Sequence, residues 1–348
     1  MRLVLPLTVR LLRELRQTNQ QQRGISLRED EFKMETVQLG KDGPLVTPIC
    51  FGCWSMGGGW RFGWADIDDD ESIAAVHKAL DLGVSFFDNA AVYGLGHAEA
   101  VLAEALGNKR KEVVIATKCG VWWFDDERGF YRNSVPAQIK RECEESLRRL
   151  RTDYIDLYQI HWPDDKVPCD ESVRALLDLV EEGKVRCVGV CNYSVDQMRE
   201  SMKAGRFTSS QSPYNMLRRD VEVDVLPFCQ ENNIGVMAYS PLASGILSGH
   251  YTEATTFGEG DWRNEDAAFQ GEQFKSHLRK VDHLRPIAQK YGKTMAQLVI
   301  AWVLRHPAVD VAIVGMKRPS HVEDVVGAVG WEIDDEDMAR IDGMLAAS

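Results

Sequence analysis

Four side chains in this sequence are of the types that move protons when a carbonyl group is reduced. Asp88, Lys118 and His161 each close a run of apolar residues, and Tyr93 follows five positions after Asp88. An unperturbed phenol has a pKa of about 10, so we expect the ammonium of Lys118 to lower the pKa of Tyr93 and make it a general acid. Asp88 would hold and balance the ammonium, and His161 would orient a carbonyl oxygen. Such a set predicts hydride transfer and requires a hydride donor.

Each of these residues also has a purely structural interpretation. Asp88 could cap a loop, Tyr93 could pack, Lys118 could be a solvated strand end and His161 a satisfied core histidine. Their places after three successive predicted strands favour one shared site instead. A Schiff-base aldolase with Lys118 as nucleophile is a further alternative, but an ion pair with Asp88 would keep that amine protonated.

The elements that must position these side chains repeat along the chain. Short runs rich in β-branched and apolar residues alternate with helical patterns, and the runs are apolar throughout, as buried parallel strands are. Eight strands are expected, over residues 47–51, 84–88, 113–117, 154–160, 185–190, 209–212, 235–239 and 311–314.

Turn and capping residues support this repeat. Residues 37–46 contain a Gly-Lys-Asp-Gly turn between short apolar stretches, which predicts a hairpin that plugs the floor of a barrel. Acidic residues 68–71 and the Ser194–Gln197 capping box mark helix starts, and Gly107, Gly183 and Gly205 mark helix ends. The alternation fits either a doubly wound sheet or a closed barrel. Polar residues at the carboxyl ends of the strands favour the barrel, so we predict an α/β fold with a single (β/α)8 TIM barrel, an N-terminal hairpin and C-terminal helices.

Composition narrows the possible partners and the compartment. The net charge of -12 disfavours nucleic acid, and no apolar run is long enough to cross a bilayer. The eight cysteines are expected to be reduced thiols of a cytoplasmic protein. We interpret the pair Cys50 and Cys53 as buried residues at a strand end and predict no metal site. The sequence leaves the oligomeric state undetermined.

The first 33 residues are predicted to be a separate unit. Met1 to Leu15 mixes Leu and Val with several Arg residues, which weakly resembles a targeting peptide, but Glu14 interrupts the basic face and no small-residue cleavage site follows. We expect residues 1–33 to be a disordered or mispredicted extension and residues 34–348 to form the barrel.

Three motifs resemble those of the aldo-keto reductases. They are Phe87-Asp88-Asn89-Ala90-Ala91-Val92-Tyr93-Gly94, Ala116-Thr117-Lys118 and Asp156-Leu157-Tyr158-Gln159-Ile160-His161. The similarity extends from about residue 37 to residue 345. Trp162-Pro163-Asp164 and Asp261-Trp262-Arg263-Asn264 are closest to the bacterial inositol-dehydrogenase-like and general-stress branch.

The resemblance implies NADP(H) bound in extended form across the barrel mouth, without a Rossmann domain. Gly94-Leu95-Gly96 does not meet the G-x-G-x-x-G fingerprint of such a domain. Segments 240–247 and 315–323 resemble the family's pyrophosphate loop and adenosine segment, where two cations beside a helix N-terminus suit a 2′-phosphate. The implied cofactor contacts are Cys53, Trp54, Asp88, Cys191, Asn192, Gln211, Tyr239, Ser240, Pro241, Leu242, Ser244, Gly245, Leu247, Gly315, Lys317, Arg318, His321 and Glu323.

Two positions depart from the family's pattern. Val325 stands where many relatives place an adenine-binding Asn, and Cys191 replaces the more usual Ser beside the nicotinamide. Asn192 also has a structural interpretation, as the residue that begins the following helix. Both departures concern the cofactor rather than the proton donor.

Aromatic residues predict a wall for the substrate. Seven of the nine tryptophans follow predicted strands, and such rings stack on sugars or ring-bearing carbonyl compounds. We expect a small carbonyl or polyol substrate that contacts Trp54, Tyr93, Trp122, His161 and Trp162. Residues 249–277 carry further aromatic rings and are interpreted as a latch over the cofactor or a static cover.

The rival function is NADP binding without turnover. Channel-associated β subunits resemble the same family and retain the same four residues, so a redox-sensing subunit is the alternative to an enzyme.

Overall fold

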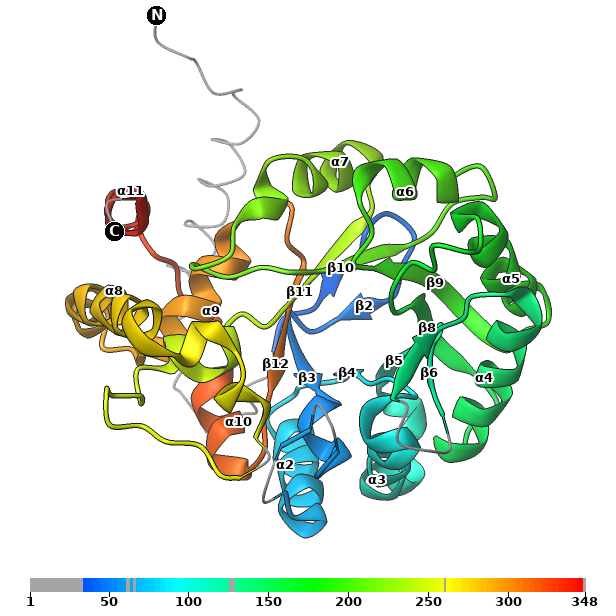
Figure 1. Ribbon diagram of the computed structural model, residues 1–348, viewed down its shortest axis with the longest axis horizontal. Coiled ribbons are helices and arrows are strands. Elements are labelled where there is room, and N and C mark those ends of the chain that lie inside the picture. Colours follow the sequence, from blue (N-terminus) through cyan, green and yellow to red (C-terminus); the bar gives the residue numbers. More distant parts are fainter. Residues whose placement is uncertain (1–33, 61–62, 65–66, 125–128, 260, 347–348) are drawn as a thin grey trace, which may run out of the picture. The chain divides into compact units, whose positions relative to one another are not determined.

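Eight parallel strands close into a barrel in the order of the sequence. The computed structural model describes residues 34–60, 63–64, 67–124, 129–259 and 261–346. Each barrel strand is hydrogen-bonded to the next, and the last pairs with the first, as the ring of strands in Figure 1 shows. The prediction of a (β/α)8 barrel is therefore confirmed, whereas the extension expected at residues 1–33 lies outside the described residues. The strands are β3 (Ile49–Gly52), β4 (Phe86–Asp88), β5 (Val114–Cys119), β8 (Ile155–Ile160), β9 (Val185–Cys191), β10 (Ser209–Pro213), β11 (Gly235–Tyr239) and β12 (Val311–Gly315).

Helices surround the barrel (Figure 1). The predicted starts are observed: Asp68 caps α2 by accepting a bond from the backbone N–H of Glu71, and Ser194 and Gln197 form a reciprocal capping box at α6. Both satisfy N–H groups that the first turn of a helix leaves without partners. The α-helices are α2 (Asp69–Asp81), α3 (His97–Leu106), α4 (Pro136–Arg149), α5 (Cys169–Glu181), α6 (Val195–Ser201), α7 (Val225–Asn232), α8 (Gly271–Lys290), α9 (Met295–Arg305), α10 (Pro319–Val326) and α11 (Asp335–Ala346).

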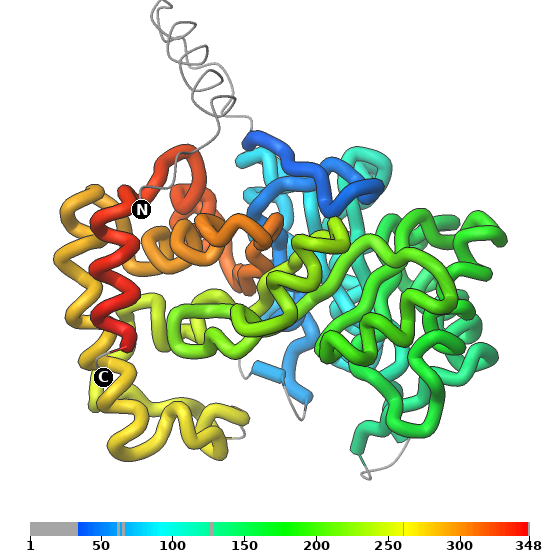
Figure 2. Tube along the Cα trace, turned by 90° about the horizontal axis from the view of Figure 1, so that it is seen from above, coloured from blue at the N-terminus to red at the C-terminus, as the bar shows by residue number. Residues whose placement is uncertain are grey.

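The predicted hairpin is present and closes the amino end of the barrel. Strands β1 (Val37–Gln38) and β2 (Leu45–Val46) pair antiparallel. Leu39 and Val46 are fully buried among apolar side chains of six barrel strands. Gly40 has φ +60°, and a Cβ there would lie 2.7 Å from the backbone nitrogen of Gly235 and 2.8 Å from the carbonyl oxygen of Thr208. Only glycine fits this approach to the strand starts. Figure 2 shows the hairpin at one end of the barrel and residues 249–259 at the other.

Strand alternation aims the polar residues into the barrel mouth. Successive side chains of a strand point to opposite faces. Phe86, Ala116 and Met237 lie in the inner apolar cluster, so Asp88, Lys118 and Tyr239, each two positions later, point inward one layer higher. Apolar residues at the intervening positions belong to the larger outer core between barrel and helices. The site is thus the uppermost layer of the barrel interior.

The segment after β5 forms a second hairpin that the sequence did not predict. Strands β6 (Val121–Trp123) and β7 (Phe130–Arg132) pair antiparallel beyond the carboxyl end of β5. The rings of Trp122 and Trp123 stack with centroids 4.1 Å apart. This hairpin adds aromatic side chains near the mouth.

Residues 249–259 and 261–277 pack against the mouth in this structure. They contain the short helices η6 (Trp262–Asn264) and η7 (Ala267–Phe269) and the first residues of α8. Phe269 and Phe274 are buried in a small apolar cluster with Ile246. The packing agrees with a cover, and whether the segment moves as a latch stays a prediction. In the part of the chain that the structure describes, no helix has the length and apolarity that a bilayer crossing requires.

Candidate active site

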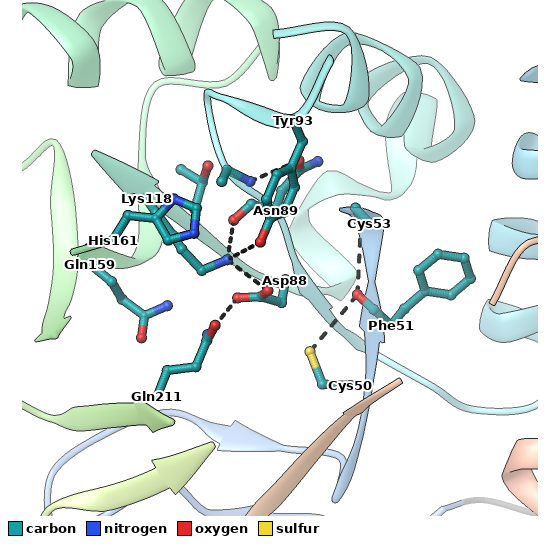
Figure 3. Close-up of polar contacts among 12 residues, drawn as sticks. Cys50, Phe51, Cys53, Asp88, Asn89, Tyr93, Lys118, Gln159, His161 and Gln211 are labelled. Carbon is teal, nitrogen blue, oxygen red and sulfur yellow. Dashed lines mark hydrogen bonds and ion pairs between the residues drawn. The ribbon is translucent and has the colours of Figure 1, made fainter. Parts of the chain in front are cut away.

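The ammonium of Lys118 is the centre of the candidate site. Lys118 is 1% exposed. Its Nζ donates to Asp88 Oδ2 at 2.7 Å, to the carbonyl oxygen of Asn89 at 2.7 Å and to the phenolic oxygen of Tyr93 at 3.2 Å (Figure 3). An ammonium has three N–H donors, so these three acceptors satisfy it completely. The structure therefore brings together Asp88, Tyr93 and Lys118 as the sequence predicts.

The surroundings of Lys118 keep it charged. Burial alone lowers the pKa of an amine, but the negative charge of Asp88 outweighs burial and raises the pKa of Lys118 above its ordinary value. A protonated amine has no lone pair for attack on a carbonyl. This argues against the aldolase alternative, which requires Lys118 as a nucleophile.

Tyr93 departs from one expectation. The sequence predicts a lowered pKa, yet burial of the phenol raises its pKa above the ordinary value, and the nearby charge of Lys118 opposes that shift without overcoming it. The prediction of a net lowering is wrong because desolvation disfavours the phenolate more than the ammonium favours it. The phenol consequently keeps its proton near neutral pH, while Lys118 already donates to the oxygen that would carry the negative charge.

His161 completes the predicted group. It follows β8, and its backbone N–H donates to the carbonyl oxygen of Cys119 at 2.8 Å. Its ring meets that of Tyr93 edge-on, with centroids 5.8 Å apart and an interplanar angle of 82°. Burial, assisted by the charge of Lys118, holds the pKa of His161 well below its usual range. The imidazole is therefore neutral and has one ring N–H to donate to a carbonyl oxygen.

The residues expected around the nicotinamide already bond to one another. Gln211 Nε2 donates to Asp88 Oδ1 at 2.9 Å. Asn192 Nδ2 donates to the carbonyl oxygen of His161 at 2.9 Å, and the hydroxyl of Tyr239 donates to Asn192 Oδ1 at 2.8 Å. Asn192 has φ 62° and lies between β9 and the capping residue of α6, so it does not begin that helix. These bonds fix side chains around the mouth.

The loop after β11 has a backbone suited to close approach by phosphate. Ser240, Ala243, Ser244 and Gly245 all have positive φ, between 46° and 99°. Such a tightly turned backbone can come close to a ligand, and it is stabilised from within, because the N–H groups of Ala243 and Gly245 donate to the carbonyl oxygens of Ser240 and Leu242 at 3.0 and 2.9 Å. The carbonyl oxygen of Ser240 also accepts from Asn215 Nδ2, outside the loop, at 3.0 Å. This geometry fits the pyrophosphate of a dinucleotide.

The segment after β12 supplies the cations. A Cβ built on exposed Gly315 would meet no atom within 4 Å, so the chain is open to a ligand there. Lys317 follows, and Arg318 is the N-cap residue of α10. Exposed Glu323 pairs with Lys78 at 2.9 Å. The donor set, with two cations beside a helix start, fits a phosphorylated nucleotide.

Several predicted contact residues have little or no exposed surface. The side chains of Cys53 and Leu247 are fully buried in the outer core, and the thiol of Cys53 donates to the carbonyl oxygen of Phe51 at 3.7 Å. Cys191 is 1% exposed. Val325, at the departure from the family pattern, is also buried in the core. For Cys53 and Leu247 the prediction of a cofactor contact is therefore limited to the backbone.

The predicted substrate tryptophans differ in access. Trp162 is 38% exposed, with the guanidinium of Arg132 5.2 Å from its ring centroid. Trp122 is nearly buried beneath Trp123 and Arg141. Trp54 meets Trp64 and Trp262 at 5.5 and 5.8 Å between ring centroids. Trp54 and Trp162 are thus more exposed than Trp122.

Two contributors were missed by the sequence reasoning. The carbonyl oxygen of Asn89 accepts one of the three bonds of Lys118, and its position directly after Asp88 was the available signal. Arg132 lies over Trp162 and donates to the carbonyl oxygen of Pro163 at 3.2 Å, but its place on an unpredicted hairpin hid it. Among the described residues, no three or more His, Cys, Asp or Glu side chains gather as metal ligands would.

The sequence profile of the Aldo/keto reductase family matches residues 48–346. The chain belongs to the aldo/keto reductase family. This confirms the resemblance seen in the sequence, and it makes the protein an oxidoreductase that acts on carbonyl or alcohol groups with a nicotinamide cofactor.

Similar proteins span nearly the whole chain. The aldo-keto reductase YhdN of Bacillus subtilis (strain 168) is 36% identical over 315 residues, which cover 90% of this chain and 94% of YhdN. The NADH-specific methylglyoxal reductase of Escherichia coli (strain K12) is 31% identical and covers 90% of this chain and 99% of its own. The structure of the glycerol dehydrogenase from Gluconobacter oxydans has a TM-score of 0.83 at 38% identity, covering 90% and 95%. An aldo-keto reductase from Klebsiella pneumoniae in complex with NADPH has a TM-score of 0.70 at 30% identity, covering 90% and 95%.

Proposed function

We propose that this aldo/keto reductase is NADP(H)-dependent and reversibly converts an aldehyde, ketone or sugar carbonyl into the alcohol, with Tyr93 as general acid and base. The observation that carries the proposal is the Asp88–Lys118–Tyr93 chain, in which a buried ammonium donates to a protonated phenol. The pair of carboxylate and ammonium would be costly to bury without a function or compensating bonds.

NADP(H), when bound, would supply or accept the hydride. The neutral ring of His161 would donate a hydrogen bond to the carbonyl oxygen and orient it toward Tyr93. The hydroxyl of Tyr93 would then give its proton to that oxygen, and the ammonium of Lys118 would stabilise the phenolate that remains. In the reverse direction the same phenolate would take the proton from an alcohol. Asp88, held by Gln211, would keep Lys118 in place.

Cofactor preference rests on the cations after β12. Lys317 and Arg318 lie where the family's adenosine segment is expected, and cations there favour a 2′-phosphate. The NADPH complex of the Klebsiella relative supports this choice, while the Escherichia coli relative is described as NADH-specific. We also assign the protein to the cytoplasm, with which its eight free cysteines agree.

The function is tested by a screen of NADPH oxidation with aldehydes, ketones and aldoses, and of NADP reduction with polyols including inositol. With the best substrate, Tyr93→Phe should lower kcat/KM by about 1000-fold, since general acid catalysis contributes factors of this order, while NADPH affinity measured by fluorescence titration changes little. Tyr154→Phe is the control, because Tyr154 precedes β8 at the opposite end of the barrel.

Near-native turnover in Tyr93→Phe would contradict the role of Tyr93. Slow, nearly irreversible NADP binding by the wild-type protein, with negligible turnover on every substrate, would instead favour the redox-sensing subunit.

A further inference from the structure

The hairpin formed by β6 and β7 contacts two sides of the mouth. The ring of Phe130 in β7 meets the ring of Trp60, in the segment after β3, with centroids 5.4 Å apart. The guanidinium of Arg132, also in β7, lies 5.2 Å from the ring centroid of Trp162, and Trp162 directly follows His161. The position of this hairpin therefore influences the side chains next to the candidate catalytic group.

Gly120 joins the two ends of the hairpin. It follows β5 directly and has φ +84°, and a Cβ there would lie 2.9 Å from Ser134 Oγ, so glycine suits this position. The backbone N–H of Asn133, just after β7, donates to the carbonyl oxygen of Gly120 at 3.1 Å. The N–H of Gly120 donates to Glu142 Oε2, in α4, at 3.0 Å. One side chain of α4 thus holds the point at which the chain leaves the barrel.

The side chain of Glu142 is fully buried. Its other oxygen, Oε1, accepts from Gln138 Nε2 at 2.8 Å, one turn earlier on the same helix. Burial raises the pKa of Glu142 to about 8, although the bonds from Gln138 and Gly120 oppose this shift. The carboxyl is therefore mostly protonated at pH 7. A glutamine amide has both donors and an acceptor, so Gln138 can accept from the protonated oxygen after its amide rotates, while Oε2 still accepts from Gly120.

We propose that Glu142 is a positioning residue for the carbonyl substrate, because its bond to Gly120 holds the hairpin of β6 and β7 at the mouth. This rests on the proposed function, in which Trp122 and Trp162 contact the substrate. Without Glu142, the buried N–H of Gly120 loses its acceptor, which is unfavourable, and the base of the hairpin shifts. Strand β5 lies across the barrel from β11, which precedes the proposed pyrophosphate loop. The shift therefore weakens binding of the substrate more than binding of the nucleotide.

The groups around Glu142 leave it as the one whose charge appears near pH 8. Burial holds the pKa of Cys119 on β5 and of Tyr158 on β8 well above their usual ranges, so both are neutral at that pH. On α4 itself, the charges of Arg141 and Glu145 act on the pKa of Glu142 in opposite directions. Acidic side chains of the neighbouring helices α3 and α5 form ion pairs with α4, namely Glu99 with Arg149 and Asp178 with Lys140.

The hold on the hairpin consequently depends on pH. If the base of the hairpin opens to water, the carboxyl of Glu142 returns to its ordinary pKa of 4.5, whereas in the closed form its pKa is about 8. The closed form therefore binds the proton more tightly, and its stability relative to the open form falls as the pH rises from about 4.5 to about 8. The apparent affinity for the substrate falls with the closed fraction.

Steady-state kinetics of the full chain, with NADPH and the best carbonyl substrate of the screen, test the proposal. Glu142→Leu removes both acceptor oxygens and should raise KM about 10-fold at pH 7, with kcat and the Kd of NADPH within about 2-fold of wild type. Glu142→Gln keeps an acceptor for Gly120 and should restore KM to within about 2-fold at pH 6. Between pH 6 and pH 9, the ratio of wild-type KM to that of Glu142→Gln should rise about 3-fold.

The matched control is Glu144→Leu, on the same helix. The side chain of Glu144 is 51% exposed and pairs with Lys184 at 2.6 Å, so KM should stay unchanged. Hydrogen exchange measured by mass spectrometry gives a second readout, which needs no turnover. In Glu142→Leu at pH 7, residues 120–123 and 130–133 should exchange faster than in wild type, and strands β11 and β12 should not.

The outcomes separate the two proposals. Unchanged KM and unchanged exchange in folded Glu142→Leu, with normal turnover, would overturn the role of Glu142 alone. An equal rise of KM in the Leu and Gln variants at pH 6 would mean a structural role and would also overturn it. If Glu142→Leu does not fold, the ratio of wild type to Glu142→Gln decides, and a ratio independent of pH overturns the proposal. Faster exchange in Glu142→Leu without reduction of any carbonyl compound by wild type would refute the proposed function and leave Glu142 as the residue that holds the hairpin.

Discussion

The barrel contains a buried ion pair at each end, and the two pairs differ in the other groups that they contact. At the mouth Asp88 pairs with Lys118, and near the floor Asp156 accepts from Arg110 Nη2 at 2.8 Å. Asp88 and Asp156 are each 3% exposed. The remaining bonds of Asp156 come from the backbone N–H of Ile115 at 3.0 Å and from Arg186 at 2.8 Å. At the mouth, one bond of the cation goes instead to the hydroxyl of Tyr93.

The difference shows what turns a buried ion pair into a reactive one. Near the floor, the carboxylate joins strands β5, β8 and β9, so the pair fixes the register of the barrel. At the mouth, the ammonium contacts a group that can exchange a proton. Breaking the first pair should cost stability, and breaking the second should cost turnover.

The largest expected effect comes from breaking the pair at the mouth. Lys118→Met removes the cation that stabilises the phenolate of Tyr93, so kcat/KM for carbonyl reduction should fall by about 1000-fold. Steady-state kinetics with NADPH and the best carbonyl substrate measure this loss. A variant that retains a tenth or more of wild-type kcat/KM would show that Lys118 serves the fold, as Arg110 does.

Breaking the pair near the floor should lower the stability of the protein and leave its turnover almost unchanged. Asp156→Asn leaves Arg110 buried without its counter-charge, and the free energy of unfolding should fall by about 3 kcal/mol, as measured by urea denaturation. Turnover at 25 °C should stay within about 2-fold of wild type. Glu272→Gln is the control, because its pair with Arg279 is exposed and should contribute less than about 1 kcal/mol. A large loss of turnover in folded Asp156→Asn would erase the distinction between the two ends.

Acid should lower the stability of the fold through His161 at the mouth. The pKa of His161 is well below its usual range, so as the pH falls through about 6.5 the unfolded chain takes up a proton that the folded chain does not, and stability declines. His161→Gln removes this contribution. Between pH 7.5 and pH 5.5 the variant should lose about 1 kcal/mol less unfolding free energy than wild type. Equal losses in both proteins would mean that His161 is charged in the fold.

The barrel was predictable because its strands have a strong local pattern. The expected strand at residues 235–239 matches β11. The strand expected at residues 113–117 continues to Cys119, because Lys118 and Cys119 still pair with Gln159 and Ile160. A lysine does not suggest a buried strand. The hairpin after β5 was missed because β6 and β7 have only three residues each, too few to show a clear alternating pattern.

The positions of the four candidate catalytic residues were predictable from the sequence, but the direction of the pKa shift of Tyr93 was not. Their order along the chain located them, and the barrel brings Asp88, Lys118 and Tyr93 into contact. The net shift of the phenol depends on a competition between burial and a nearby charge, which spacing does not reveal. The contact of Trp64 with Lys317 joins residues far apart in sequence and follows from closure of the barrel between β3 and β12.

The plug formed by Leu39 and Val46 has a kinetic consequence. Because packed side chains fill the amino end of the barrel, the nucleotide and the carbonyl substrate must both reach Tyr93 through the mouth at the carboxyl end. The reactant that binds deeper in the barrel must bind first and dissociate last. The protein should therefore show compulsory-order kinetics in which the inner reactant leaves only after the outer one has left.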